Sequence, residues 1–237
     1  MSETVTLDSS GSEMKLFTAA PQGKAKGAVV VIQEAFGMTK HIKDVCQSLA
    51  DAGYLAVAPH VFHRSGDPLI GYDKMADVVP HIMKLNREGI EADLKASFDY
   101  LAAKGFSGRQ VGIVGFCMGG SIAFFAGAQH ELGAAVSFYG AGISQGRFGL
   151  PALIELAPVM KTPLMANFGD KDQSIPVTEV EALREAAAKS GVATEVNRYA
   201  DADHGFHCRD RSAFHEASSK AAWERTIQFL DSHVKAG

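Results

Sequence analysis

The sequence predicts an α/β protein with a mostly parallel central sheet and helices on both of its faces. Short, almost continuously apolar segments alternate with helical patterns along the 237 residues, as parallel strands connected by crossover helices require. The apolar segments show little polar alternation, which indicates strands buried on both faces. No linker and no internal repeat divides the chain, so residues 1–237 are expected to form a single domain.

Six strands are predicted from apolar segments rich in β-branched residues. They are expected at Ala28–Ile32, Tyr54–Ala58, Val111–Phe116, Ala134–Phe138, Pro163–Phe168 and Thr194–Tyr199.

Helices are predicted between these strands. The first carries four apolar residues at i, i+3, i+4 and i+7, and Gly53 then supplies a C-terminal cap. The segment Val61–Asn86 mixes Gly, Pro, Asp, His and Met, and is expected to form a loop and a helix that cover the site. The apolar stripe consists of Ile42, Val45, Cys46 and Leu49, and further helices are expected at Ile90–Lys104, Met118–Ala128, Thr178–Ser190 and Ala213–Val234.

The composition is typical of a globular protein and argues against several kinds of partner. The chain is 46% hydrophobic and 21% charged, and its net charge is −4. Lys and Arg are scattered without a basic stripe, so nucleic acid is not an expected partner. No apolar run has the length of a bilayer span, so no membrane association is expected. The N-terminus lacks the pattern of a secretory signal, so a cytoplasmic location is expected.

The three cysteines, Cys46, Cys117 and Cys208, are widely spaced and form no CxxC pair. This spacing argues against a disulfide framework and against a zinc ribbon. His60 and His63 have metal-ligand spacing, but no third ligand is evident, and they are expected to line the cleft or face water. No metal or other cofactor is expected, and the protein could be a monomer or a homodimer.

The strongest motif is Gly115-Phe116-Cys117-Met118-Gly119-Gly120, which follows a predicted strand and opens an Ala- and Phe-rich helix. A G-x-nucleophile-x-G elbow requires this strand-turn-helix context, and the turn requires glycine beside the nucleophile. A cysteine in this place is a strong nucleophile whose thiolate the helix N-terminus favours. A free cysteine is usually a small buried side chain, but the context favours Cys117 as the nucleophile.

Two backbone amides are candidates for an oxyanion hole. The N–H of Met118 follows the nucleophile, and a second donor is expected after the first predicted parallel strand, near Ala35. The same glycine-rich segment does not support dinucleotide binding, because it lacks the G-x-G-x-x-G register.

The remaining members of a catalytic triad follow in the order nucleophile, acid, histidine, each after a strand. Asp172 or Asp170 could be the acid, and Asp172 is preferred because a G-x-x-D run ending in apolar-Pro resembles the acid loop of α/β-hydrolases. His204 in Asp-His-Gly-Phe is the expected base, with His207 as a weaker competitor. The acid would orient the imidazole and stabilise the imidazolium.

Four segments together resemble the dienelactone hydrolase family: Q-E-A-F-G at Gln33 to Gly37, G-F-C-M-G-G, G-D-K-D-x-x-I-P and D-H-G-F. The resemblance covers nearly the whole chain and implies the α/β-hydrolase fold. It implies that Glu34 helps to take the proton from Cys117, and it matches Arg209 to a family arginine near the substrate. Between Phe206 and this arginine, two residues stand here where the family has one.

The family reaction is the hydrolysis of an enol-lactone that bears a carboxylate, through a thioester on the cysteine. Family members bind the substrate carboxylate with two arginines, one of them after the second central strand. This sequence has no Arg between Ser65 and Asn86, and only Arg64 and Arg87 flank that segment.

The sequence therefore favours a Cys-dependent ester or lactone hydrolase that acts on a small molecule. A thioesterase or general small-ester hydrolase with the same triad is the alternative. A non-catalytic binding protein on this fold is a second alternative, because a fold does not fix a function. A peptidase ranks last.

Overall fold

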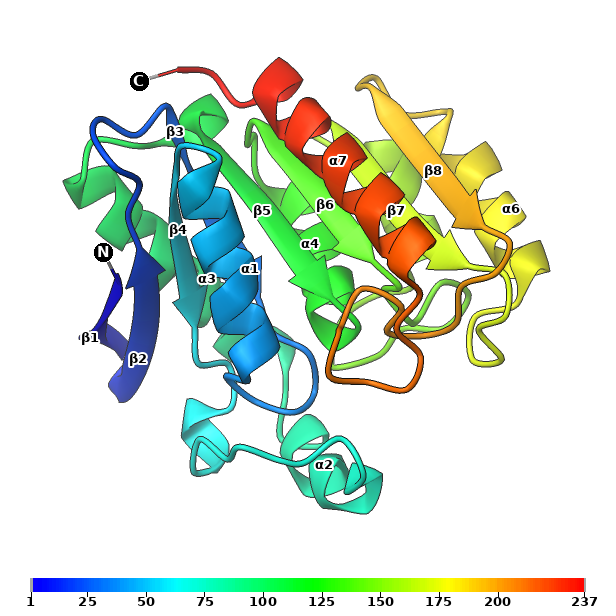
Figure 1. The fold of residues 1–237 in the computed structure, drawn as a ribbon, viewed down its shortest axis with the longest axis horizontal. Coiled ribbons are helices and arrows are strands. Elements are labelled where there is room, and N and C mark those ends of the chain that lie inside the picture. The colour runs from blue at the N-terminus through cyan, green and yellow to red at the C-terminus, as the bar shows by residue number, and fades with distance from the viewer. Residues whose placement is uncertain (1, 237) are drawn as a thin grey trace.

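A single eight-stranded sheet forms the centre of the molecule (Figure 1), in the order β1-β2-β4-β3-β5-β6-β7-β8. The structure, a computed structural model, describes residues 2–236. All neighbouring pairs from β4 to β8 are parallel, whereas β1–β2 and β2–β4 are antiparallel. The strands are β1 Ser2–Ser9, β2 Ser12–Ala19, β3 Gly27–Ile32, β4 Tyr54–Pro59, β5 Val111–Phe116, β6 Ala134–Phe138, β7 Leu164–Gly169 and β8 Thr194–Tyr199.

All six predicted strands are confirmed, with bounds that differ by no more than one residue. Every residue of β3, β5, β6 and β7 is buried. Helices cover both faces, which explains why these strands are continuously apolar. The predicted α/β-hydrolase fold is therefore confirmed.

The N-terminal hairpin of β1 and β2 was not predicted. Its strands are largely polar, and β2 buries Met14 and Leu16. The turn between them places Ser10 at φ 51° and Gly11 at φ 80°, as in a two-residue hairpin turn with positive φ at both positions. The Ser-Gly pair was the available signal, because this dipeptide often marks a turn.

Two helices cover one face of the sheet, α1 (Lys40–Asp51) and α7 (Glu216–His233), and they lie in front of it in Figure 1. The opposite face is covered by α3 (Arg87–Ala103), α4 (Met118–Gln129) and α6 (Val177–Ala187). The shorter helical segments are η1 His63–Ser65, α2 Met75–Ile82, η2 Gly108–Gln110, α5 Leu153–Leu156 and η3 Ala157–Val159.

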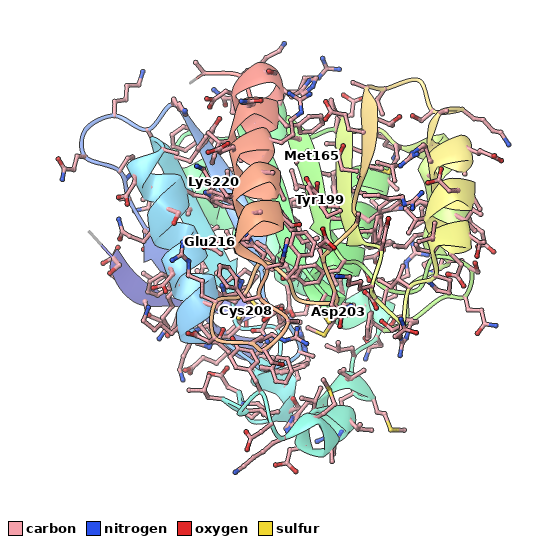
Figure 2. The ribbon with its side chains drawn as sticks, turned by 45° about the vertical axis from the view of Figure 1, so that its right-hand side comes forward. Met165, Tyr199, Asp203, Cys208, Glu216 and Lys220 are labelled. Atoms are coloured by element: carbon pink, nitrogen blue, oxygen red, sulfur yellow. The ribbon has the colours of Figure 1, made fainter. Side chains whose placement is uncertain are left out.

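The helix bounds follow from local capping. Helix α3 begins three residues earlier than predicted because the Asn86 side chain accepts a hydrogen bond of 2.8 Å from the Gly89 N–H. Helix α7 begins later than predicted because His215 is its N-cap. A long loop therefore connects Tyr199, at the end of β8, to Glu216, at the start of α7. Figure 2 shows Asp203 and Cys208 in this loop.

A loop and a helix were expected in the segment 61–86, and this segment contains η1 and α2. It lies beyond the ends of the strands in Figure 1. None of the helices within residues 2–236 combines the length and the apolar character needed to cross a bilayer. The cytoplasmic location stays a prediction.

Candidate active site

Cys117 lies in a sharp turn between β5 and α4. Its backbone has φ 55° and ψ −119°, a conformation that a side-chain-bearing residue adopts only when the surroundings enforce it. A Cβ on Gly115 would lie 1.9 Å from the Gly119 carbonyl oxygen, and one on Gly119 would lie 2.4 Å from the Ile32 carbonyl oxygen. Glycine is therefore required at both positions, and the predicted tight turn is confirmed.

The turn brings Cys117 to His204. Cys117 Sγ lies 3.1 Å from His204 Nε2, and His204 Nδ1 lies 2.6 Å from Asp172 Oδ2. The other carboxylate oxygen, Asp172 Oδ1, accepts hydrogen bonds from the Ser174 amide at 2.8 Å and the Ser174 hydroxyl at 2.6 Å. The Asp172 carboxylate is thus held on both oxygens and fixes the orientation of the imidazole.

The two candidate acids have different partners. Asp170 makes two hydrogen bonds of 2.8 Å to the Arg198 guanidinium, whereas the Asp172 side chain is 1% exposed and contacts His204. Asp172 is the carboxylate in line with the histidine and the cysteine. Asp170 instead anchors its loop to β8.

The electrostatics favour a charged histidine in this line. Burial by itself lowers the pKa of His204, but the negative charge that Cys117 Sγ carries once it is deprotonated, and then the Asp172 carboxylate, raise it to about 10. For Asp172, burial raises the pKa, but hydrogen bonds from His204 and Ser174 outweigh it and hold the pKa below the ordinary value. The site therefore stabilises an imidazolium between a carboxylate and a sulfur.

Glu34 is fully buried at the end of β3 and pairs with an arginine. Its Oε1 lies 3.2 Å from Arg211 Nη1 and 3.4 Å from the Tyr139 hydroxyl. Burial raises the pKa of Glu34, while the charges of Arg211 and His204 oppose that shift. The carboxylate, arginine and tyrosine form a polar group beside the cysteine and the histidine.

The arginine beside Glu34 is Arg211, so the match to Arg209 was wrong. The Arg209 guanidinium lies 5.6 Å from the Phe214 ring centroid, at a surface cavity that Lys40 and Trp223 also line. The loop turns between Gly205 and Arg211 and brings Arg211 back against Gly205, where an added Cβ would lie 2.3 Å from the Arg211 Nη1. Counting residues from Phe206 therefore selected the wrong arginine, because the loop turns before it reaches Glu34.

The two candidate oxyanion donors lie in adjoining segments. Met118 is the first residue of α4, whose N–H has no acceptor within the helix. Ala35 is buried in the loop after β3, and the close approach of Gly119 to the Ile32 and Gln33 carbonyls packs this strand end against the first turn of α4.

The other histidines named from the sequence have separate partners. His207 is stacked on Phe116 and Trp223 and hydrogen-bonded to Ser219, and burial lowers its pKa to about 3. His60 Nδ1 lies 2.8 Å from Asp67. The His63 side chain is 3% exposed, so the expectation that it lines the cleft or faces water was wrong.

Arg64 and Arg87, which flank the segment without arginine, are both engaged in ion pairs. Arg64 Nη1 lies 2.7 Å from Asp93, and Arg87 Nε lies 2.8 Å from Glu91.

Sequence reasoning missed Arg211, Tyr139 and Ser174. Tyr139 directly follows β6, at the strand end next to that of β5, and it has φ 40° while being fully buried. A polar aromatic residue directly after a buried strand was the available signal, because functional groups gather at the carboxyl ends of parallel strands.

Comparison with known proteins places the chain in one family. A model of the dienelactone hydrolase family matches residues 14–234. A Salmonella typhimurium protein named "Putative carboxymethylenebutenolidase" is 32% identical over 233 residues, covering 95% of this chain and 85% of that protein. A Synechocystis protein of the same name is 31% identical, covering 98% and 96%. The crystal structure of a "Putative Dienelactone Hydrolase" from Klebsiella pneumoniae superposes with a TM-score of 0.89 and 31% identity over 98% of both chains. The chain therefore belongs to the dienelactone hydrolase family of hydrolases that act on ester bonds.

Proposed function

We propose that the protein hydrolyses small carboxylic esters or lactones through a thioester on Cys117, with His204 as base and Asp172 as the acid that orients it. The observation that carries this proposal is the continuous line from Asp172 through His204 to Cys117 Sγ, with distances of 2.6 and 3.1 Å. The line ends in a strained turn at a helix N-terminus, where a nucleophile is exposed to its substrate and a thiolate is stabilised.

The chemistry follows from these positions. The Cys117 thiolate attacks the carbonyl carbon, and the Met118 and Ala35 amides stabilise the oxyanion. Collapse of the tetrahedral intermediate breaks the C–O bond, the imidazolium of His204 gives the proton taken from Cys117 to the leaving oxygen, and a thioester and a neutral imidazole remain. His204 then takes a proton from water, the hydroxide breaks the thioester, and the carboxylic acid is released with the cysteine restored.

Glu34 is proposed to help remove the proton from Cys117 when substrate enters. Its buried carboxylate is balanced by Arg211 at 3.2 Å, and a substrate that competes for Arg211 would release the carboxylate for this role. The raised pKa of Glu34 supports the role, because a carboxylate with a raised pKa is a stronger base.

The enol-lactone is the first substrate to test, because relatives at 31–32% identity carry the name carboxymethylenebutenolidase. General small-ester or thioester hydrolysis is the second candidate. The absence of an arginine between Ser65 and Asn86 favours it, since the family's second arginine for the substrate carboxylate comes from that segment.

The deciding experiment measures hydrolysis of cis- and trans-dienelactone by ultraviolet absorbance, beside a small aryl ester and an acyl thioester, with Cys117→Ala as control. Dienelactone turnover that is lost in the variant supports the enol-lactone reaction. Turnover of the ester or thioester alone, lost in the same variant, supports the second candidate. Turnover that survives Cys117→Ala contradicts the nucleophile.

A binding protein without turnover would behave differently toward alkylation. Cys46 is fully buried, and burial raises its pKa, so it is the internal reference thiol. Cys117 should react with iodoacetamide much faster than Cys46 because the thiolate is the reactive form. Equal rates would favour the binding protein.

A further inference from the structure

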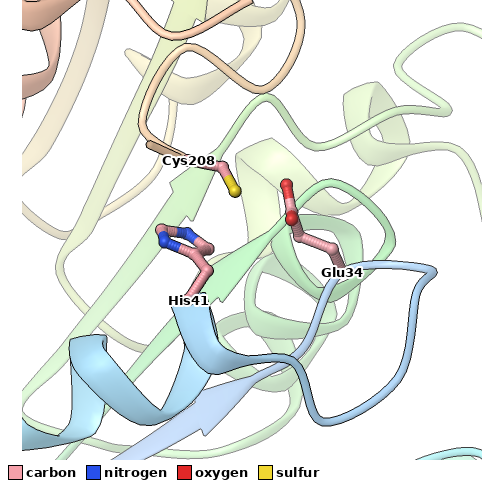
Figure 3. A group of neighbouring side chains, drawn as sticks. All are labelled: Glu34, His41 and Cys208. Atoms are coloured by element: carbon pink, nitrogen blue, oxygen red, sulfur yellow. The ribbon is translucent and has the colours of Figure 1, made fainter. Parts of the chain in front are cut away.

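Three metal-ligating side chains from distant parts of the sequence meet beside the candidate active site. Glu34 follows β3, His41 lies in the first turn of α1, and Cys208 lies in the loop between β8 and α7. Figure 3 shows the three side chains pointing toward one another. One potential ligand atom from each lies within 4.8 Å of the other two, and all three residues are buried.

Two of the three side chains have a buried atom without a partner. Glu34 Oε2 and His41 Nε2 make no hydrogen bond with any residue in the described range 2–236, although Glu34 is 0% and His41 6% exposed. A buried polar atom left unpaired costs about 1–3 kcal/mol. Two residues of one cluster that each carry an unpaired buried atom, with a thiol in the same cluster, indicate a place for a ligand that satisfies both.

The chemistry of the three donors selects the ligand. We propose that Glu34, His41 and Cys208 form a binding site for Zn²⁺, the ion that takes carboxylate oxygen, imidazole nitrogen and thiolate sulfur together. Bond lengths of about 2.0–2.3 Å place tetrahedral ligand atoms roughly 3.3–3.8 Å apart, so an inward shift of about 1 Å closes the site. As the Zn–S bond forms, the Cys208 thiol loses its proton to solvent, and nothing is oxidised or reduced.

The surroundings supply a fourth position and set the charge. The Tyr72 hydroxyl lies 3.3 Å from Cys208 Sγ, so this hydroxyl or a water molecule completes four-coordination. Glu34 and the Cys208 thiolate together balance the two charges of the ion. Arg211 binds Glu34 Oε1 and leaves Oε2 for the metal, but its positive charge weakens the binding. We therefore expect a reversible site.

Reversible zinc binding would act on the enzyme through Glu34. A carboxylate bound to zinc cannot accept a proton from Cys117, so zinc would inhibit ester hydrolysis. This consequence rests on the proposed function, whereas the metal site itself does not.

The binding test uses the full chain with Cys117→Ser, because Cys117 and His204 could themselves hold a metal. Co²⁺ serves as the spectroscopic probe for Zn²⁺, since a thiolate ligand gives a charge-transfer absorption in the near ultraviolet. The band is expected in the Cys117→Ser protein, and added Zn²⁺ should remove it. Adding Cys46→Ala is the matched control and should leave the band unchanged.

The band should disappear when Cys208→Ser is added. His41→Gln provides a second test that leaves the thiol in place, and it should weaken Co²⁺ binding at least tenfold. Near-ultraviolet circular dichroism checks that each variant is folded. Absence of the band in the Cys117→Ser protein, or a band that persists in folded Cys208→Ser protein, would overturn the site.

Activity separates the two proposals. With Cys117 intact, zinc should inhibit ester hydrolysis, and Cys208→Ser should raise the half-inhibitory zinc concentration at least tenfold relative to the zinc-free rate of that variant. A Cys208-dependent cobalt band without zinc inhibition would keep the metal site and contradict the role of Glu34. A missing cobalt band, together with ester hydrolysis that depends on Cys117, would contradict the metal site and keep the proposed hydrolase function.

Discussion

Two places in this molecule set a histidine between a carboxylate and a nucleophile-bearing side chain, and they differ in what surrounds them. At the candidate active site, His204 lies between Asp172 at 2.6 Å and Cys117 at 3.1 Å. In the N-terminal hairpin region, His63 lies between Asp93 at 3.0 Å and Ser12 at 3.1 Å. The distances alone do not distinguish the two groups.

The other hydrogen-bond partners of His63 and Asp93 prevent this second group from activating Ser12. The Glu13 carbonyl oxygen lies 3.0 Å from His63 Nδ1 and can only accept a hydrogen bond, so Nδ1 is the protonated nitrogen and has no lone pair for the Ser12 hydroxyl. The Arg64 guanidinium lies 2.7 Å from Asp93 and 2.8 Å from His63 Nε2. Ser12 begins β2 and does not sit at a helix N-terminus. The hydrogen bonds of this group connect the hairpin to α3. The comparison shows that a catalytic triad needs a histidine nitrogen with a free lone pair and a nucleophile in a strained turn, in addition to short distances.

The largest difference should appear when the nucleophile or base is removed. Cys117→Ala and His204→Ala should each lower kcat/KM for the best ester substrate on the order of 10³-fold or more. Ser12→Ala should leave kcat/KM within about twofold, because Ser12 takes no part in the chemistry. Steady-state kinetics on the three folded variants measures this. Normal rates in His204→Ala would contradict the triad.

Replacing the carboxylate of each group, Asp172 or Asp93, should have different consequences. Asp172→Asn should lower kcat/KM by about 10²–10⁴-fold with the fold intact, because the imidazole loses its orientation and the stabilisation of its charge. Asp93→Asn should instead lower the free energy of unfolding by about 1–3 kcal/mol, since it weakens the ion pair between the buried Asp93 and the partly exposed Arg64.

Denaturant unfolding and steady-state kinetics on both variants separate the two effects. A large loss of activity in folded Asp93→Asn protein would show that the hairpin group is more than structural.

The two turns can be compared through their glycines. Gly119→Ala should lower the free energy of unfolding by about 2–4 kcal/mol, because its Cβ would lie 2.4 Å from the Ile32 carbonyl oxygen and that backbone cannot yield. Gly11→Ala, in the hairpin turn, meets nothing within 4 Å and has φ +80°. It should cost about 1–2 kcal/mol, from the backbone conformation alone. Chemical denaturation measures both, and equal losses would contradict the crowding of the elbow.

The smallest effect is the pH dependence of stability that His204 contributes. Its pKa is raised in the folded protein to about 10, above the ordinary 6.5, so the contribution is fully present below pH 6.5 and is lost as the pH rises through about 10. The difference in melting temperature between the wild-type protein and His204→Gln should therefore shrink from pH 6.5 to 10. A difference that grows with pH would mean that the folded site favours neutral imidazole.

Much of the fold could be predicted because buried parallel strands leave a local signature. Five strands were located from apolar runs, and the elbow was located from its glycines. The expectation of burial on both faces was wrong for β8, an edge strand that carries Glu195, Asn197 and Arg198 and is only partly buried. The hairpin of β1 and β2 was missed because its strands alternate and carry many polar residues. Alternation of this kind indicates a half-buried strand, so the hairpin had a signal of its own, different from the continuously apolar runs that marked the buried strands.

What the sequence by itself determined is the set of groups placed at strand ends. Cys117, Asp172 and His204 follow β5, β7 and β8, and the carboxyl ends of parallel strands meet at one edge of the sheet. Chain order and strand positions were therefore enough to bring them together.

Only the tertiary structure decided which side chains complete the site. Arg211 and not Arg209 reaches Glu34, because the path of the loop after β8 depends on packing against Gly205. The meeting of Glu34, His41 and Cys208 depends on the same loop and on the start of α1. Loop paths are set by contacts between distant segments, and no local pattern in the sequence records them.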